Sequence, residues 1–274
     1  MNEIALSVDT LTKDFRLRGR GHGDENSFNH MQRAVNSVSF NLCRGEILGL
    51  AGGSGSGKTT LARCIVRLIE PDSGSVFLGD DDVLKVHGKD LRRLRRRIQM
   101  VFQDPYSSLN PRLTVGDALF EVGHVLCAVD KEHSKQFVDD LLEKVQLPKG
   151  MASRRPRELS GGQRQRVAIA RALAAGPEVL IADEAVSALD VSVQAQLLGV
   201  FRDLRDELGV SILFVTHQLA VLAEVADRVA IMWQGQIVEN AQTREILNHP
   251  QHEYTKRLLA AHPNSDPRRR SDFS

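Results

Sequence analysis

The stretch "EILGLAGGSGSGKTTLARCIVRLI", residues 46–69, decides the fold. It starts with an apolar run typical of a short buried strand. It ends with a run of helical periodicity, whose apolar face is predicted to comprise Leu61, Ile65 and Leu68. The glycine-rich loop between the two runs matches the pattern G-x-x-x-x-G-K-T in full. A strand, such a loop and a helix in this order predict a loop that binds phosphate groups.

The residue types of this loop suit the β- and γ-phosphates of a nucleotide. Glycines let the backbone curl so that successive N–H groups face the phosphates. Lys58 supplies a positive charge to them, and Thr59 offers its hydroxyl to Mg²⁺. The predicted loop, called the P-loop below, comprises Gly52, Gly53, Ser54, Gly55, Ser56, Gly57, Lys58, Thr59 and Thr60.

The bulk properties are those of an ordinary soluble globular protein of one or two domains. The chain has 274 residues, a net charge of +1, 42% hydrophobic residues and 26% charged residues. The balanced charge argues against a protein that mainly wraps nucleic acid. We expect neither a signal peptide nor a membrane span, because no basic and apolar leader and no apolar run of about 20 residues occurs. The three cysteines are far apart and are predicted to be buried, reduced thiols.

The order of predicted elements indicates an α/β protein with additions. Residues 4–15 and 35–42 alternate as an antiparallel strand pair does, and the polar, glycine-rich residues 16–30 between them are predicted to be a flexible insertion. Strands and helices then alternate, which predicts a largely parallel sheet covered by helices on both faces. Residues 104–158 read only as helices and loops, and therefore as an insertion into that fold.

Two carboxylates follow a strongly apolar stretch in "EVLIADEAVSALD", residues 178–190. Asp183 is predicted at the carboxyl end of a strand, where α/β sheets bind ligands, and suits Mg²⁺ bound through water. Glu184 follows directly and is placed to polarise a water for in-line attack on the γ-phosphate. Mere surface charge is the alternative.

Two further polar residues end predicted core strands. Gln103 follows "IQMVF", and its amide suits Mg²⁺ or the attacking water, although a polar loop residue is the alternative. His217 ends "SILFVTH" at the same edge, which favours a contact to the γ-phosphate over a purely structural histidine.

A second anion-binding loop is predicted in "ELSGGQRQRVAIARAL", residues 158–173. Ser160, Gly161 and Gly162 lie where a loop enters a helix, and the backbone N–H groups of such a junction attract anions. A chain that already has a P-loop has a use for this loop only if another chain brings the phosphate.

These motifs in this order resemble the nucleotide-binding subunit of ABC transporters. "GGSGSGKTT" resembles the Walker A loop, Gln103 the Q-loop, "LSGGQ" the signature, "LIADE" Walker B, "SALD" the D-loop and His217 the switch histidine. The resemblance implies a P-loop NTPase (RecA-like) core with an antiparallel β subdomain and a helical subdomain inserted at about 104–160. It also implies one nucleotide-binding domain over 1–262 and a disordered tail over 263–274.

The same resemblance implies the ligands and the working assembly. Two such domains bind head to tail with ATP and Mg²⁺ between them, so that Ser160, Gly161, Gly162 and Gln163 hold the γ-phosphate of the partner's ATP. The resemblance also implies that Asp190, in the D-loop, binds the nucleotide. Phe15 would stack on the adenine, with a core phenylalanine as the alternative.

A narrower resemblance points to the oligopeptide, dipeptide and nickel importer ATPases. It rests on "QDPYSSLNPR" at 103–112, "DEAVSALDVSVQAQ" at 183–196 and "HPQHEYTKRLLAAHP" at 249–263. The resemblance implies two transmembrane permease subunits, a second ATPase subunit (identical or different) and, indirectly, an extracytoplasmic solute-binding protein. It places the chain peripherally on the cytoplasmic face of the membrane, with no nucleic acid as partner.

The sequence departs from the family pattern at two positions. Gly53 stands where an acidic residue is frequent, and Ala185 where proline is common. The resemblance also implies that "YSSLNPRLTVGDAL", at 106–119, lines a groove for a short helix of the membrane subunit. The alternatives are an exporter ATPase and a soluble ABC protein acting on nucleic acid. The basic run at 92–97 is predicted to be a solvated helix face rather than a site for nucleic acid or lipid.

Overall fold

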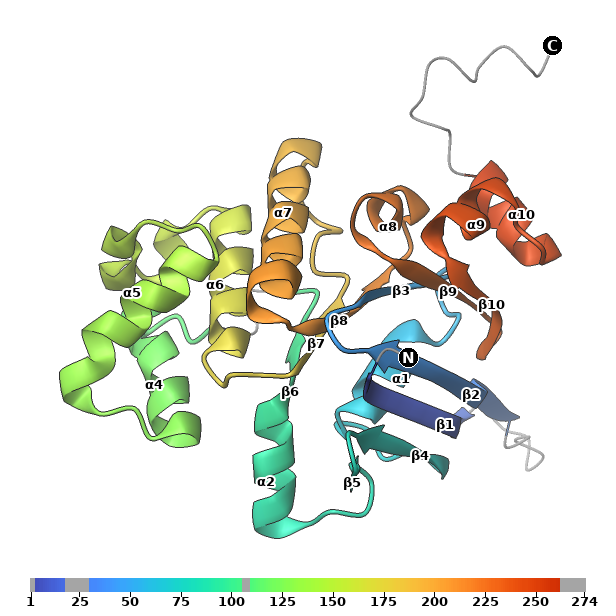
Figure 1. Ribbon diagram of the computed structural model, residues 1–274, viewed down its shortest axis with the longest axis horizontal. Helices are drawn as coiled ribbons and strands as arrows, with labels where there is room; N and C mark the ends of the chain where they lie inside the picture. The colour runs from blue at the N-terminus through green and yellow to red at the C-terminus, as the bar shows by residue number, and fades with distance from the viewer. Residues whose placement is uncertain (1–2, 18–29, 105–108, 262–274) are drawn as a thin grey trace, which may run out of the picture.

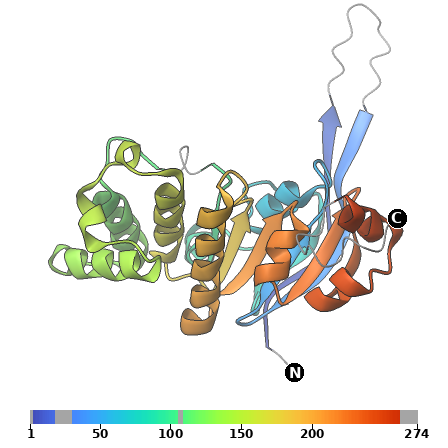
Figure 2. The ribbon, with the colours of Figure 1, turned by 90° about the horizontal axis from the view of Figure 1, so that it is seen from above.

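The computed structural model describes residues 3–17, 30–104 and 109–261 (Figure 1). The predicted tail at 263–274 and most of the insertion at 16–30 lie outside the described residues. Two β-sheets and a group of helices make up the described part. In both views the helices α4, α5 and α6 gather at the end of the molecule opposite to the paired strands β1 and β2 (Figures 1 and 2). Their bounds are α4 Val115–Cys127, α5 Ser134–Lys144, α6 Gly161–Leu173, β1 Ile4–Leu17 and β2 His30–Cys43.

The first sheet is antiparallel and has the strand order β2-β1-β4-β5. β1 pairs with β2 from Ile4–Cys43 to Leu17–His30, so both strands are longer than predicted and take in the ends of the stretch expected to be flexible. Leu6 and Val8 of β1 are buried while Ser7 and Asp9 are not, as expected for a sheet with one covered face. The remaining strands are β4 Ser73–Leu78 and β5 Asp81–Asp82.

The central sheet has the order β10-β9-β3-β8-β7-β6 and is parallel except for β10 at its edge. Its inner strands β3, β7 and β8 are buried along their whole length, as parallel strands covered on both faces must be. The predicted parallel α/β core is confirmed. The bounds are β3 Ile47–Ala51, β6 Ile98–Val101, β7 Val179–Asp183, β8 Ser211–Thr216, β9 Arg228–Trp233 and β10 Gln236–Gln242.

Alternate residues of the inner strands belong to two apolar cores on the two faces of this sheet. Leu213 and Val215 face the core shared with the antiparallel sheet and α1, whereas Phe214 faces the core shared with α7 and the helical group. Phe201 of α7 and Phe214 are fully buried and meet edge to face with ring centroids 5.1 Å apart. Burying each such ring contributes about 1.5–3 kcal/mol, so this contact fixes α7 on the sheet. The helices of the core are α1 Lys58–Ile65, α2 Gly88–Arg97, α7 Val191–Leu208, α8 Leu219–Val225, α9 Thr243–Asn248 and α10 Glu253–Ala260.

The segment between β6 and α6 contains helices and no strand in its described residues. α4 begins at a capping box, in which the Thr114 side chain accepts from the Asp117 backbone N–H and the Asp117 carboxylate accepts from Thr114. A short turn of 3₁₀ helix at Lys131–His133 lies between α4 and α5, and two more, at Lys149–Ser153 and Pro156–Glu158, lie between α5 and α6. Over the described residues no helix is both long and apolar enough to cross a membrane.

Two local predictions were wrong. The helix after the P-loop ends at Ile65, and Arg67 takes a φ of 54°, so Leu68 is 54% exposed instead of continuing the buried face of Leu61 and Ile65. The short helix α9 was not predicted at all.

The basic run at 92–97 is only partly a solvated face. Arg95 and Arg96 donate to the backbone carbonyls of Arg67 and Ala175. Arg97 binds Glu178 through two N–H···O bonds and also pairs with Asp81. Much of the run thus ties α2 to the segments after α1 and α6, to β5 and to the residue before β7.

Candidate functional site

The P-loop connects β3 to α1 in a conformation that needs glycine. Gly57 has a φ of 105°, in the left-handed region that side chains avoid. A Cβ at Gly57 would lie 2.0 Å from the carbonyl oxygen of Ala34 on β2. The loop is therefore packed tightly against the antiparallel sheet, and a larger residue at Gly57 has no room.

Lys58 is folded back onto its own loop. Its side chain is almost fully buried, and its ammonium donates to the carbonyl oxygens of Gly52 at 2.8 Å and Gly53 at 2.9 Å. Burial lowers the pKa of Lys58, and the nearby carboxylates of Glu184 and Asp183 partly oppose this. A buried cation at the mouth of the loop is stabilised by an incoming anion, which fits a phosphate group.

Thr59 and Asp183 bring two hard oxygen donors together. The Thr59 hydroxyl donates to the Asp183 carboxylate at 3.1 Å. Burial raises the pKa of Asp183, and the Thr59 bond opposes that shift. A cation beside this carboxylate would favour its ionised form. The Thr59 hydroxyl and the Asp183 carboxylate fit Mg²⁺, which prefers oxygen ligands and retains several waters. The described residues contain no cluster of three or more His, Cys, Asp and Glu side chains suited to a metal.

Glu184 is held by the other two predicted catalytic side chains. The Gln103 amide donates to Glu184 Oε2 at 2.9 Å, and His217 Nδ1 lies 3.3 Å from Glu184 Oε1. Glu184 has a φ of 49°, a costly conformation for a side chain of this size. This turns the chain sharply after β7 and leaves the carboxylate partly exposed beside the P-loop lysine rather than buried in the sheet.

The sheet topology explains why these residues meet. β6, β7 and β8 are adjacent and parallel. Each strand has a predicted site residue at or just beyond its carboxyl end: Gln103 for β6, Asp183 and Glu184 for β7, and His217 for β8. The carboxyl ends of parallel strands share one edge of the sheet, and the P-loop follows β3 at that same edge.

The second predicted anion loop is a separate group. Ser160 caps α6, with its hydroxyl accepting from the Gln163 N–H and the Gln163 side chain accepting from the Ser160 N–H. This leaves the amides of Gly161 and Gly162 in the first turn, which have no acceptor within the helix. Among the described residues, no hydrogen bond or ion pair links this turn to the P-loop.

The loop's close neighbour is instead the start of α7. A Cβ at Gly162 would lie 2.4 Å from Val193 Cγ1, and one at Gly161 would lie 3.5 Å from Leu189. Asp190 is nearby as the N-cap of α7, where its carboxylate accepts from the Val193 N–H at 3.0 Å and from the Ser192 hydroxyl. These bonds lower the pKa of Asp190. They give this predicted ligand residue a capping role at α7.

Phe15 is not a core residue. Its side chain is 37% exposed, and the Lys13 ammonium lies 5.6 Å from the ring centroid. Phe15 pairs with Gln32 on β2, two residues before Ala34, whose carbonyl oxygen abuts Gly57. The ring is thus exposed at the strand end near the P-loop, which leaves it free to stack on a base.

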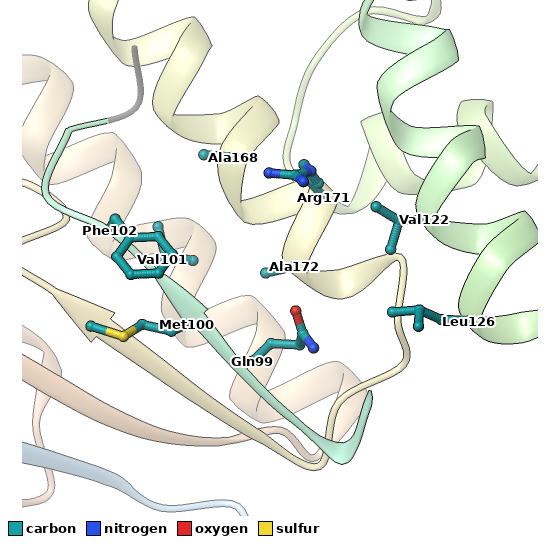
Figure 3. Close-up of a pocket in the computed structure, with 9 residues that line it drawn as sticks. All are labelled: Gln99, Met100, Val101, Phe102, Val122, Leu126, Ala168, Arg171 and Ala172. Carbon is teal, nitrogen blue, oxygen red and sulfur yellow. The ribbon is translucent and has the colours of Figure 1, made fainter. Parts of the chain in front are cut away.

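A pocket of about 250 Å³ opens one residue before Gln103 (Figure 3). β6 lines one wall, and α4 and α6 line the other, as the labelled side chains show. A second, more open pocket of about 620 Å³ lies wholly in the helical group. The predicted groove at 106–119 contributes Thr114, Gly116 and Asp117 to the second pocket only, and its residues 106–108 lie outside the described part. The first pocket is lined by Gln99, Met100, Val101, Phe102, Val122, Leu126, Ala168, Arg171 and Ala172.

One contact at the P-loop was not foreseen. The Gly53 backbone N–H donates to the Tyr254 hydroxyl at 2.7 Å, although the two residues are 201 positions apart. The segment around Tyr254 contributed only to the family resemblance in the sequence, since no local pattern pairs a tyrosine in a terminal helix with a distant loop.

A comparison with protein families finds that the profile described as ABC transporter matches residues 35–187. A probable peptide ABC transporter ATP-binding protein of Sinorhizobium fredii is 47% identical, over 98% of this chain and 75% of that protein. The glutathione import ATP-binding protein GsiA of Pectobacterium atrosepticum is 44% identical, over 98% of this chain but only 42% of its own length.

A solved structure has the same fold. It is a dimeric ATP-binding cassette in a post-hydrolysis state, bound to ADP and Pi. The TM-score is 0.73 at 29% sequence identity, and the match covers 87% of this chain and 99% of that one.

Proposed function

The chain belongs to the ABC transporter family as an ATP-binding ATPase, and from this premise we propose that it energises the uptake of peptides through partner membrane subunits. The importer direction and the peptide class are supported by the names of the relatives, one for peptides and one for glutathione, which is itself a tripeptide. A dipeptide or oligopeptide is the proposed solute class, and a nickel chelate is the runner-up from the sequence pattern. An exporter is not favoured.

The observation that carries the proposal is the bonding of Glu184. Its carboxylate is shared by Gln103 and His217, beside the buried Lys58 and the Thr59–Asp183 pair. An ATPase needs a carboxylate placed to accept a proton from water next to a cationic phosphate cradle.

The proposed chemistry assigns one task to each side chain. Lys58 exchanges the carbonyl oxygens of its own loop for the β- and γ-phosphate oxygens of ATP. Thr59, Asp183 and Gln103 would hold Mg²⁺, which would neutralise charge on the phosphates when bound. Glu184 orients the attacking water and takes its proton, and His217 contacts the γ-phosphate. Gln103 and His217 already restrain the Glu184 carboxylate, so their rearrangement on ATP binding would free it for this role.

The proposed working unit is a head-to-tail pair of ATPase domains. Each P-loop would receive ATP that is completed by Ser160, Gly161, Gly162 and Gln163 of the other domain. The separation of this turn from the P-loop within one chain supports that arrangement, as does the dimeric state of the matched cassette. ATP would favour the closed pair and hydrolysis would release it.

The proposed assembly adds two permease subunits at the cytoplasmic face of the membrane, with an extracytoplasmic binding protein presenting the solute. In place of the groove predicted at 106–119, the pocket beside Gln103 is the proposed docking place for a side chain of a permease helix. A helix seated against Phe102 would sense the movement of Gln103 when ATP binds, which couples hydrolysis to the gate.

Purification from the native membrane in mild detergent tests the assembly. Mass spectrometry is expected to find two polytopic membrane proteins and either a second P-loop ATPase or a second copy of this chain. ATP hydrolysis by the purified complex is expected to rise on addition of a peptide-loaded binding protein, and the matched Glu184→Gln complex is expected to stay inactive. Isolation without any membrane protein would refute the transport role, and stimulation only by a non-peptide solute would refute the peptide class.

A further inference from the structure

The C-terminal part of the chain makes two hydrogen bonds to the backbone of the P-loop. The Tyr254 hydroxyl, on α10, accepts the Gly53 N–H at 2.7 Å. The Gly235 N–H, in the turn between β9 and β10, donates to the Ser56 carbonyl at 3.0 Å. The two partners of the loop, Tyr254 and Gly235, lie outside the phosphate-binding pattern.

Trp233 lies next to both partners of the loop, Tyr254 and Gly235. Its ring stacks on that of Tyr254, with centroids 5.4 Å apart and planes 20° apart, and it stands at the end of β9 directly before the turn that contains Gly235. We define Trp233, Gly235 and Tyr254 as the brace.

The brace is itself firmly anchored. The Glu239 carboxylate of β10 accepts the backbone N–H groups of Gln251 at 2.8 Å and His252 at 3.1 Å, just before α10. Thr255, the residue after Tyr254, is fully buried. Tyr254 therefore meets the loop from a fixed position.

The Tyr254 bond acts on the peptide unit that holds Lys58. The N–H that Tyr254 accepts and the Gly52 carbonyl that binds the Lys58 ammonium at 2.8 Å belong to the same peptide plane. In a trans peptide these two groups point in opposite directions, so fixing one fixes the other. A Cβ at Gly53 would lie 3.0 Å from the Tyr254 hydroxyl, so a larger residue there would have to displace the tyrosine slightly.

We propose that Tyr254 is a positioning residue for nucleotide binding, which sets the resting place of the Lys58 ammonium through the Gly52–Gly53 peptide. The inference deepens the proposed function and depends on it. With the hydroxyl gone, this peptide can rotate, and ATP must then order the loop as it binds. Ordering that accompanies binding lowers affinity, whereas the reaction of bound ATP uses groups that Tyr254 does not touch.

The test compares Tyr254→Phe with wild type in ATP binding and in hydrolysis by the full chain. Loss of one hydrogen bond of ordinary strength predicts a Kd for ATP that is about 2- to 10-fold higher. KM should rise in the same proportion while kcat at saturating ATP stays the same. Lys256→Gln is the matched control on the same helix, since Lys256 pairs with Glu253 there, and its Kd should equal that of wild type.

Trp233 provides a spectroscopic signature, because it is the single tryptophan of the chain. Its emission should change when ATP is added to wild type, since the loop held by the brace changes its contacts when Lys58 leaves the loop carbonyls. In Tyr254→Phe the ring stack remains, yet the hydroxyl link is cut, so the change should shrink. A purely structural role would lower the melting temperature while leaving this signal and the Kd in place.

The outcomes separate the two levels of inference. A Tyr254→Phe variant with the wild-type Kd would refute the positioning role of Tyr254, and so would one in which kcat falls and KM does not change. Either result leaves the proposed function intact. A wild-type chain that neither binds nor hydrolyses ATP overturns the proposed function and the brace together.

Discussion

Replacing Gly162 by alanine tests how α6 is placed against α7. The added Cβ would lie 2.4 Å from Val193 Cγ1, a distance at which the Val193 side chain or one of the two helices must shift. Forcing one extra carbon into a packed contact costs about 1–3 kcal/mol. Alanine returns at most about 1 kcal/mol of helix propensity, and less in a first turn. The free energy of unfolding should therefore fall by about 1–2 kcal/mol.

Urea unfolding of the purified chain without nucleotide measures this change directly, from the shift of the midpoint at constant slope. Gly161→Ala is the matched control, because its Cβ would lie 3.5 Å from Leu189, an ordinary contact. Its stability should stay within about 0.5 kcal/mol of wild type.

The double variant Gly162→Ala, Val193→Ala removes the methyl group that the new Cβ meets. The two changes should then be non-additive, with a favourable coupling of about 1 kcal/mol or more. Additive effects, or a Gly162→Ala variant as stable as Gly161→Ala, would refute the close contact between the start of α6 and α7.

Three further predictions concern the nucleotide site and the packing of α2. Phe15→Ala should raise the Kd for ATP about 5-fold or more, because stacking on a base contributes about 1–3 kcal/mol; equilibrium binding measures it, with the exposed Met31→Ala on β2 as the unaffected control. Thr59→Ala should lower ATP hydrolysis and raise the Mg²⁺ concentration needed for half-maximal rate, and an unchanged Mg²⁺ dependence would argue against a metal at Asp183. Glu178→Gln should lower stability by about 0.5–1 kcal/mol at neutral pH, since the pair with Arg97 is partly exposed. The Arg97 bond lowers the pKa of Glu178, so this stabilisation is present above the ordinary glutamate value and is lost as the pH falls through the lowered one. Unfolding curves of both proteins should therefore converge in acid.

The core of the site was predictable because strand ends carry positional information. The residues after β6, β7 and β8 had to share one edge once the strands were recognised as parallel, and Gln103, Glu184 and His217 do meet there. Their roles in catalysis stay predictions, as do those of Ser160 and its neighbours.

Other features depend on tertiary contacts that leave no local pattern. Leu68 continues the helical periodicity, but the helix has already ended at Ile65 and Arg67 turns the chain. The basic run looks like a solvated face because its acceptors, such as the carbonyl of Ala175, are distant in sequence. The Tyr254–Gly53 bond was missed for the same reason.

The central claim is that two ATPase domains close on ATP and that Glu184 is the group that lets them reopen. Size-exclusion chromatography with multi-angle light scattering on the Glu184→Gln variant, with and without ATP, tests it most directly, together with the partner ATPase that co-purifies. The account predicts a stable pair with ATP that does not form without nucleotide, and its loss when Ser160→Arg is added to the variant. A Glu184→Gln chain that stays monomeric with ATP and its partner present would contradict the account.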